Sequence, residues 1–182
     1  MESRDLLLVI CSIGAIQSLF WGIYLIVFDK RNLSSKLLAG FFLALAIRII
    51  KSTLWIFYED VNLLIINAGF AAHAAIGPFL LLYLQSLSKT VRLKRKHLLH
   101  FVPTVLILVL STQLKLDSFW NIGAYGVLAF QSILYLLIAG GWYYNNKSGL
   151  SKKENTWSLL LILGTAIVFG AYFTEYIAGP LM

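Results

Sequence analysis

Long apolar segments fill most of this 182-residue chain, and short polar stretches separate them. A helix needs about 20 apolar residues to cross the hydrocarbon core of a bilayer, because the core is about 30 Å thick and each residue rises about 1.5 Å. Backbone amides in lipid must find partners within the chain, which favours helices. The sequence therefore predicts an all-α fold, a polytopic transmembrane bundle of about six helices in a single membrane domain, residues 1–182. We expect spans at 6–28, 37–58, 61–87, 97–111, 118–144 and 156–177, the fourth being the shortest.

The composition argues against a water-soluble domain. Hydrophobic residues make up 59% of the chain and charged residues 13%, whereas soluble domains are about half apolar and one quarter charged. Fifteen Lys and Arg against eight Asp and Glu give a net charge of +7, which in a soluble protein would indicate a polyanionic partner. Here the charges have another explanation, because eleven of the fifteen fall in three loops on one side of the predicted bundle. These eleven are Lys30, Arg31 and Lys36; Lys89, Arg92, Lys94, Arg95 and Lys96; and Lys147, Lys152 and Lys153.

This charge asymmetry predicts an orientation. Short cytoplasmic loops retain positive charge, so we expect a bacterial cytoplasmic (inner) membrane protein with its three basic loops in the cytoplasm and its N-terminus outside. The loop after the third span is the most basic. We expect it to contact anionic lipid head groups rather than RNA, because contact with the adjacent membrane explains its positive charge with fewer assumptions. The contacting residues predicted there are Arg92, Lys94, Arg95 and Lys96.

Two basic residues cannot be explained by the loops. Arg48 and Lys51 lie inside the second segment, where a charge near the bilayer centre costs about 2.5 to 3.5 kcal/mol. They are three residues apart on one helical face, which predicts that both point into the bundle. Glu175 in the last segment is an available carboxylate for Lys51. Three interpretations stay open: a buried ion pair that fixes helix packing, an outward-opening pocket with Arg48 as donor to an anionic or polar ligand, and snorkelling of Lys51 to the interface.

Further polar residues complete the predicted intramembrane site. His73 lies near the middle of the third segment, and Gln17, Asn67 and Gln131 are polar insertions in other apolar runs. A lone histidine is either a hydrogen-bonded packing residue or a proton-sensing or ligand-binding group. The predicted site therefore comprises Arg48, Lys51, His73, Glu175, Gln17 and Asn67.

Small residues and aromatic residues predict how the helices pack. Small side chains let helix backbones approach closely in lipid. We expect such approach around Gly69, Ala71, Ala72, Ala75 and Gly77, and around Gly164, Ala166, Gly170 and Ala171. Pro78 predicts a kink in the third span. Trp120 is one of several aromatic residues near span ends that are typical of interfacial belts.

The sequence shows no catalytic signature and no cofactor motif. A Ser-His-Asp pattern, a P-loop, a dinucleotide-binding glycine pattern and an HExxH motif are all missing, so we expect no enzyme, no catalytic residue and no cofactor. His97 and His100 share a helical face but lack a third ligand, so we expect no metal site.

The order of these features resembles the N-terminal membrane domain of AraC-type helix-turn-helix transcription regulators of Bacteroidetes. The most specific parts are Arg-x-x-Lys-Ser at 48–52 and His-x-x-x-Gly-Pro at 73–78; the segments 14–20, 32–39, 67–73, 83–87 and 100–103 also match. The resemblance implies a sensor-like membrane bundle followed by a further span and a cytoplasmic DNA-binding domain. This chain contains no helix-turn-helix, so we expect no direct nucleic acid binding. It is then either a truncated regulator or a stand-alone module that acts through a cytoplasmic output domain or partner protein.

Three functions are therefore considered. The first is a multi-pass inner-membrane sensor or signalling module that uses the intramembrane polar site. The second is a small transporter or carrier in which the same charges handle substrate or protons. The third is a structural subunit of a membrane protein complex, held by helix packing alone.

Overall fold

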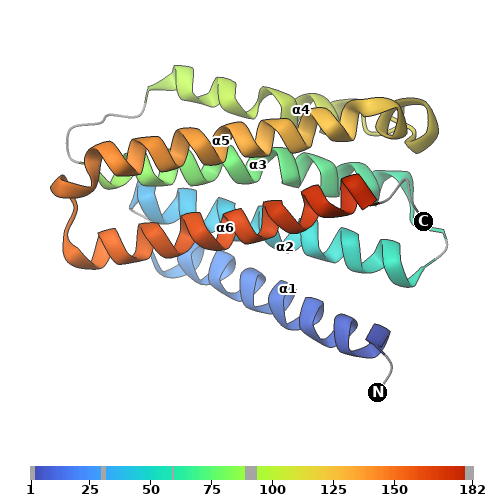
Figure 1. Cartoon of the computed structure of the whole chain (residues 1–182), viewed down its shortest axis with the longest axis horizontal. Coiled ribbons are helices and arrows are strands. Elements are labelled where there is room, and N and C mark those ends of the chain that lie inside the picture. Colours follow the sequence, from blue (N-terminus) through green and yellow to red (C-terminus); the bar gives the residue numbers. More distant parts are fainter. Residues whose placement is uncertain (1–2, 30–31, 59, 89–93, 179–182) are drawn as a thin grey trace.

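A computed structural model describes residues 3–29, 32–58, 60–88 and 94–178, without the side chains of Ser3, Arg4, Ile122 and residues 175–178. All regular structure in these residues is helical, which confirms the predicted all-α fold (Figure 1). The long helices are α1 (Ser3–Phe28), α2 (Leu33–Phe57), α3 (Leu63–Leu87), α5 (Tyr125–Asn146) and α6 (Lys152–Ala178). Shorter elements are η1 (Arg95–Phe101), α4 (Val102–Val109), η2 (Leu116–Ala124) and η3 (Lys147–Gly149).

Five of the helices, α1, α2, α3, α5 and α6, are long and apolar enough to cross a membrane. The chain thus has the character of a multi-pass membrane protein. The fourth expected span, 97–111, takes a different form: a 3₁₀ helix, η1, continues into α4, which has only 8 residues. Pro103 gives the physical reason, because it has no N–H to donate to Leu99 and cannot continue an α-helix from η1. A 3₁₀ helix rises about 2.0 Å per residue, so η1 and α4 together still extend about 26 Å.

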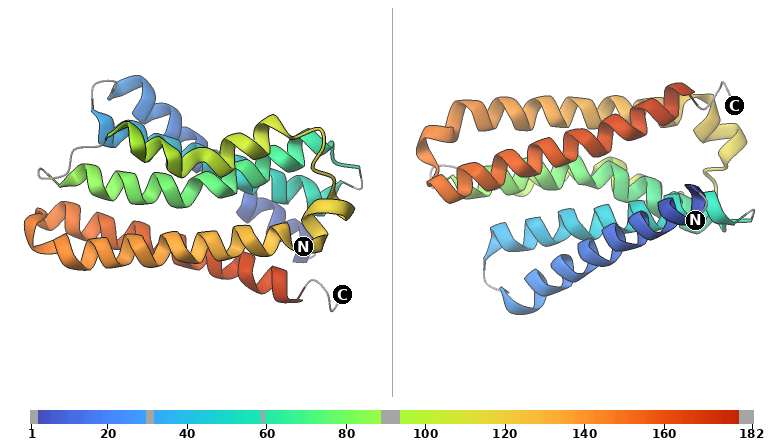
Figure 2. Two further views of the ribbon diagram at one scale, coloured as in Figure 1. Left: turned by 90° about the horizontal axis from the view of Figure 1, so that it is seen from above. Right: turned by 60° about the horizontal axis from the view of Figure 1, so that its bottom comes forward.

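Helix α3 is the centre of the bundle. The α1–α2 pair and the α5–α6 pair lie on either side of it (Figure 2). In its most apolar window 72% of residues are buried, compared with 17% for α1 and α5. The predicted close approach along α3 is confirmed, since Ala71, Ala72 and Ala75 are buried and two glycines touch neighbouring helices. A Cβ built on Gly69 would lie 2.3 Å from Lys51 Cγ, and one on Gly77 would lie 2.6 Å from Tyr135 Cβ.

The second predicted set of small residues does not pack in this way. A Cβ built on Gly164 or Gly170 would meet no atom within 4 Å among the described residues. The expectation of close approach at these two glycines of α6 is therefore wrong for the described bundle. The reason is that α6 packs against α5 and α3 with other faces, which leaves both glycines exposed.

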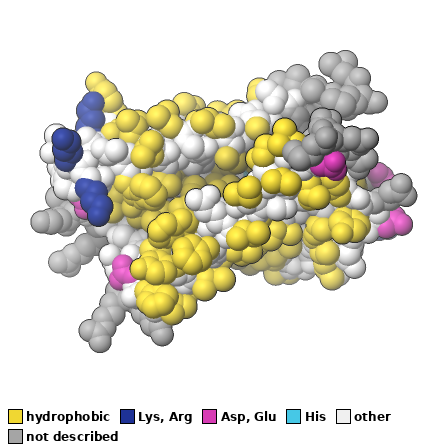
Figure 3. All heavy atoms as spheres, turned by 90° about the horizontal axis from the view of Figure 1, so that it is seen from below, with side chains coloured by type: hydrophobic (Ala, Val, Ile, Leu, Met, Phe, Trp, Pro, Cys, Tyr) yellow, Lys and Arg dark blue, Asp and Glu magenta, His cyan; other side chains and the backbone are white. Residues whose placement is uncertain are grey.

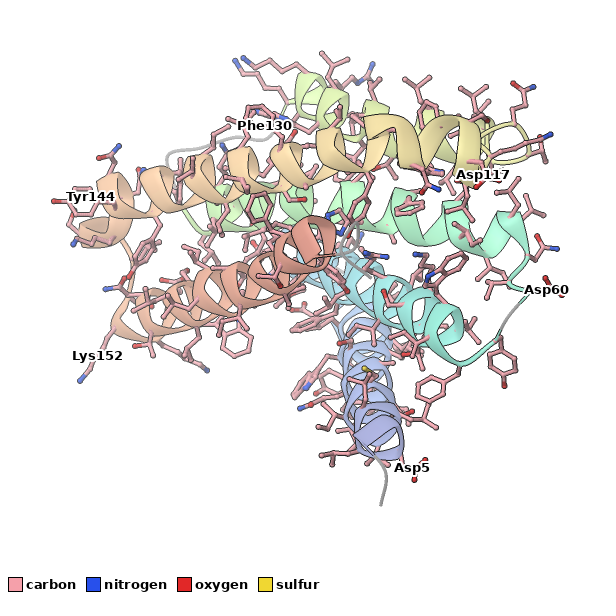
Figure 4. The ribbon with its side chains drawn as sticks, turned by 45° about the vertical axis from the view of Figure 1, so that its right-hand side comes forward. Asp5, Asp60, Asp117, Phe130, Tyr144 and Lys152 are labelled. Carbon is pink, nitrogen blue, oxygen red and sulfur yellow. The ribbon has the colours of Figure 1, made fainter. Side chains whose placement is uncertain are left out.

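Apart from Arg48 and Lys51, the described charged side chains lie toward the two ends of the bundle. Asp60 and Asp117 lie at one end, whereas Tyr144 and Lys152 lie at the other (Figure 4). On the face that Figure 3 draws, the Lys and Arg side chains lie at one end of the bundle, and Lys152 lies at this end in Figure 4. We call this end the basic end. The chain passes along the bundle between the two ends six times, with η1 and α4 together making the fourth passage.

Candidate intramembrane polar site

Arg48 is the most unusual buried residue. Its side chain is 1% exposed, in the middle of α2. The guanidinium carbon lies 4.1 Å from the centre of the Tyr172 ring and 5.7 Å from that of Phe70, and Nη2 donates to Tyr125 Oη at 3.3 Å. Cation–π contacts reach about 2 kcal/mol or more when desolvated. Among the side chains that the structure describes, however, Nε and Nη1 have no hydrogen-bond partner.

Lys51 lies one turn further along the same face. It is 8% exposed, and Nζ lies 4.5 Å from the centre of the Phe70 ring and 5.5 Å from that of Trp55. Its aliphatic stem occupies the space above Gly69, which explains why that position has no side chain. The prediction that Arg48 and Lys51 both turn into the bundle is therefore confirmed, and the Phe70 ring contacts both cations.

His73 belongs to the same group through Tyr172. Its ring contacts that of Tyr172 edge-on at 5.3 Å, and Nε2 lies 2.8 Å from Ser132 Oγ. Ser132 has one hydroxyl hydrogen and donates it to Leu128 O, so neutral His73 is the donor through Nε2–H. Nδ1 is then an acceptor, and it has no partner among the described side chains. The fold thus joins three of the predicted site residues, Arg48, Lys51 and His73, around the rings of Phe70 and Tyr172. We call these five residues the cation–aromatic cluster.

Two predicted site residues are not joined to the cluster by any described contact. Gln17 lies on an exposed face of α1, which packs against α2 through its other face. The side chain of Glu175 lies outside the described residues. Its backbone is in α6 three residues after Tyr172, which places both on one helical face. Pairing between Glu175 and Lys51 therefore stays a prediction.

Asn67 is buried, and both its amide nitrogen and its amide oxygen have hydrogen-bond partners within the protein. Its Nδ2 donates to Ser111 O at 2.6 Å and to Leu114 O at 3.0 Å, and its Oδ1 accepts from Trp120 Nε1 at 2.7 Å. These bonds connect the turn after α4, which contains Ser111 and Leu114, to α3. Trp120, expected in an interfacial belt, is instead 3% exposed and stacks on Phe70 at 4.0 Å. The expectation for Trp120 was wrong because Asn67 offers its indole N–H a partner inside the bundle.

Gln131 has a specific structural role. Pro78 cannot donate a backbone bond to Ala74 O, which would otherwise lack its helical partner. Gln131 Nε2 donates to that carbonyl at 3.1 Å. The polar insertion in α5 thus compensates for the proline in α3, as expected where proline is tolerated in transmembrane helices.

Three of the four residues predicted to contact lipid head groups lie among the described residues, at the basic end. Lys94, Arg95 and Lys96 are exposed there, whereas Arg92 lies outside the described residues. His97 and His100 stack with ring centres 6.3 Å apart, and each Nδ1 has a partner: Lys94 N–H donates to His97, and Tyr135 Oη lies 2.7 Å from His100. Among the described side chains no group of three or more His, Cys, Asp or Glu could hold a metal ion.

Four residues at the polar site were not among the predicted site residues: Phe70, Tyr125, Ser132 and Tyr172. A signal for some of them was present in the spacing. Phe70 lies midway between Asn67 and His73 on one helical stripe, and Ser132 follows Tyr125 by seven residues, or about two turns. The spacing did not show which stripes face one another.

The fold and this cluster define a polytopic helical membrane bundle with cations buried among aromatic rings. Comparison of the chain with protein-family models, with curated proteins and with solved structures finds no match.

Proposed function

We propose that this chain is a multi-pass inner-membrane sensor or signalling module of a bacterium, and that its cation–aromatic cluster binds a small anionic or polar ligand. The observation that carries the proposal is Arg48. A guanidinium that is 1% exposed has two nitrogens without a partner among the described side chains. Buried donors normally have partners, so an exception in a membrane interior favours a functional site.

The chemistry of the cluster suits a carboxylate or a phosphate. Arg48 presents a planar fork of donors that matches the paired oxygens of such groups, and charge-assisted bonds of this kind are about twice as strong as neutral ones. His73 Nδ1 adds an acceptor for a ligand hydroxyl. The Arg-x-x-Lys-Ser and His-x-x-x-Gly-Pro elements, which carry the resemblance to the membrane domain of AraC-type regulators, supply the polar side chains of this cluster. That convergence supports the sensor interpretation.

Binding at Arg48 provides a way to change the bundle. The Tyr172 ring of α6 lies against the guanidinium of α2, so a ligand that takes this position displaces α6 relative to α2. A ligand shifts a conformational equilibrium only through different contacts in the two states, and this displacement supplies such a difference. We propose that the basic end faces the cytoplasm and that an output domain or partner protein there responds to the shift.

Trp120 allows the proposal to be tested. Its ring stacks on Phe70, which contacts both cations, so its fluorescence reports on the cluster. The full chain, with its other four tryptophans changed to Phe, is placed in nanodiscs and titrated with acetate, succinate and inorganic phosphate. We expect a saturable fluorescence change with at least one of these anions. Arg48→Gln abolishes it, whereas Arg95→Gln, which removes an exposed arginine at the basic end, keeps it. An equal response in both variants would refute the proposal.

Two further measurements separate the alternatives. Uptake of the bound anion into liposomes that Arg48→Gln abolishes would favour a carrier, whereas binding without flux favours a sensor.

A purely structural Arg48, paired with a buried carboxylate, predicts that Arg48→Met lowers the free energy of unfolding by about 3 to 5 kcal/mol, because its partner would be left charged. A ligand-binding Arg48 predicts loss of binding with little loss of stability. If Gly69 or Ala72 variants destroy assembly while Arg48→Met leaves function intact, the structural-subunit interpretation holds.

A further inference from the structure

A second candidate site lies between α2 and α6, away from the cation–aromatic cluster. An apolar groove of about 220 Å³ runs between the two helices. Phe41, Phe42 and Leu45 of α2 form one wall, and Leu161, Gly164 and Val168 of α6 form the other. The α1–α2 pair and the α5–α6 pair stand apart here, on either side of α3 (Figure 2).

A second, shallower hollow lies beside the groove on α6 and shares Leu160 with it. Lys152, Lys153, Thr156 and Trp157 line this hollow, and Leu160 lines both it and the apolar groove. Lys152 and Lys153 are exposed at the basic end. Trp157 is half-exposed, in the position where amphipathic rings meet head groups. Two exposed lysines at the start of α6 therefore lie next to an apolar groove further along the same helix.

We propose that this surface binds an anionic phospholipid, with Lys152 and Lys153 on its phosphate and one acyl chain in the groove. The binding of a lipid at this place does not depend on the function proposed for Arg48. Basic pockets at the cytoplasmic edge of transmembrane helices suit anionic head groups. A free anion would bind the lysines alone and would leave the apolar groove empty. The site also differs from the predicted lipid contact at Lys94, Arg95 and Lys96, which lies at the start of η1 and not on α6.

The dimensions and the polar groups fit this occupant. From Leu160 to Val168 the groove extends about 12 Å along α6, close to the thickness of one leaflet of hydrocarbon, about 15 Å. Thr165 is a polar side chain in its lining, and its hydroxyl already donates to Leu161 O at 2.7 Å. Glu154, the acidic residue beside the two lysines, accepts a bond from Ser151 N–H at 2.8 Å and so caps its own helix.

Gly164 provides a direct test of the acyl-chain groove. A Cβ built there meets no atom within 4 Å among the described residues, and Gly164 lines the groove, so we expect the ring of Gly164→Phe to occupy part of it. Gly170→Phe is the matched control, because Gly170 is also open and exposed on α6 but does not line the groove. Native mass spectrometry of the full chain in detergent measures retention of added palmitoyl-oleoyl phosphatidylglycerol. We expect retention to fall about tenfold in Gly164→Phe, because the lipid would lose contact over roughly two methylene groups. Retention in Gly170→Phe should be unchanged.

The head group is tested with phosphatidylcholine of the same acyl chains. We expect the wild type to retain phosphatidylglycerol in preference to phosphatidylcholine. Changing both Lys152 and Lys153 to Gln removes this preference, whereas changing both Lys36 and Lys147 to Gln removes the same charge from two other exposed lysines and keeps it.

Several results would overturn the proposal. They are equal retention in Gly164→Phe and Gly170→Phe, an equal effect of the two lysine pairs, or no preference in the wild type. A dimer that Gly164→Phe abolishes without any lipid adduct would place a second copy of the chain in the groove instead. If Gly164→Phe fails to fold, Gly164→Leu replaces it with the same expectation.

Discussion

Asn67 and Arg48 show two different fates of a polar side chain inside an apolar bundle. Asn67 forms three hydrogen bonds and leaves no group unused, so it stabilises the turn between α4 and η2. Arg48 has one hydrogen bond and two ring contacts, and two of its nitrogens have no partner among the described side chains. The first pattern is typical of structure and the second of a binding site. The sequence placed both residues in one predicted site and did not distinguish these two roles.

Asn67→Leu is predicted to destabilise the bundle more than Gln131→Leu. Removing Asn67 leaves three buried groups without partners: Trp120 Nε1 and the carbonyls of Ser111 and Leu114. Removing Gln131 leaves one, Ala74 O. Hydrogen bonds between transmembrane helices average about 0.6 kcal/mol, so we expect a loss of about 2 kcal/mol against about 0.6 kcal/mol. Unfolding by sodium dodecyl sulfate measures both, and equal losses would contradict the structural role assigned to Asn67.

At the scale of the helices, proline and glycine decide where elements break and approach. Pro103 ends the 3₁₀ helix η1 and begins α4, so this passage consists of two short helices. Gly123 joins η2 to α5 with φ at 125°, a conformation that only glycine adopts without strain. Glycines along α3 instead permit close contact with α2 and α5. The spacing of these residues therefore explains both the irregular fourth passage and the central position of α3.

Gly77→Ala is predicted to destabilise the contact between α3 and α5, whereas Gly140→Ala is not. The new methyl at Gly77 would lie 2.6 Å from Tyr135 Cβ, an atom next to the backbone that cannot move aside alone. Overpacking of this kind costs about 1 to 3 kcal/mol. Gly140 is in α5 with open space around it, so alanine there gains helix propensity at no steric cost. Thermal unfolding in detergent should lower the Tm of the first variant only, and an unchanged Tm would show that α5 can shift freely.

At the scale of the whole molecule, the six passages place the basic loops together. Asp60 and Asp117 share the opposite end although the passage between α3 and η2 is not one long helix (Figure 4). The elements η1 and α4 occupy the part of the chain where the hydropathy pattern predicted a fourth span, and a crossing there stays a prediction. Because α4 lies against α3, its short helix is supported by protein on one side.

Cysteine labelling tests this arrangement in cells. The chain has one cysteine, so Cys11→Ser gives a background without thiols. We expect a membrane-impermeant maleimide to label Asp60→Cys and Asp117→Cys in intact cells, because both lie at the end that we propose faces outward. Ser151→Cys, beside the basic end, should react only after permeabilisation. Labelling of Asp60→Cys and Asp117→Cys from different sides would show that η1 and α4 do not carry the chain across.

The sequence alone predicted the all-helical class, the positions of five long spans and the inward direction of Arg48 and Lys51. It also placed small residues of α3 in contact with other helices. These features follow from local quantities, because hydropathy, charge and side-chain size act wherever a segment meets lipid, water or a neighbour. The break of the fourth span was also encoded locally, by Pro103, but apolar length outweighed it in the prediction.

Only the tertiary structure decided which polar group meets which partner. Asn67 faces Trp120, Gln131 faces Ala74 O, and Tyr172 lies on Arg48 because α3, α5 and α6 adopt particular rotations about their axes. Each rotation depends on the packing of all the helices together, which no single segment specifies. The open faces at Gly164 and Gly170 arise for the same reason. The sequence determined what each helix must bury, and the packing of the bundle determined what it is buried against.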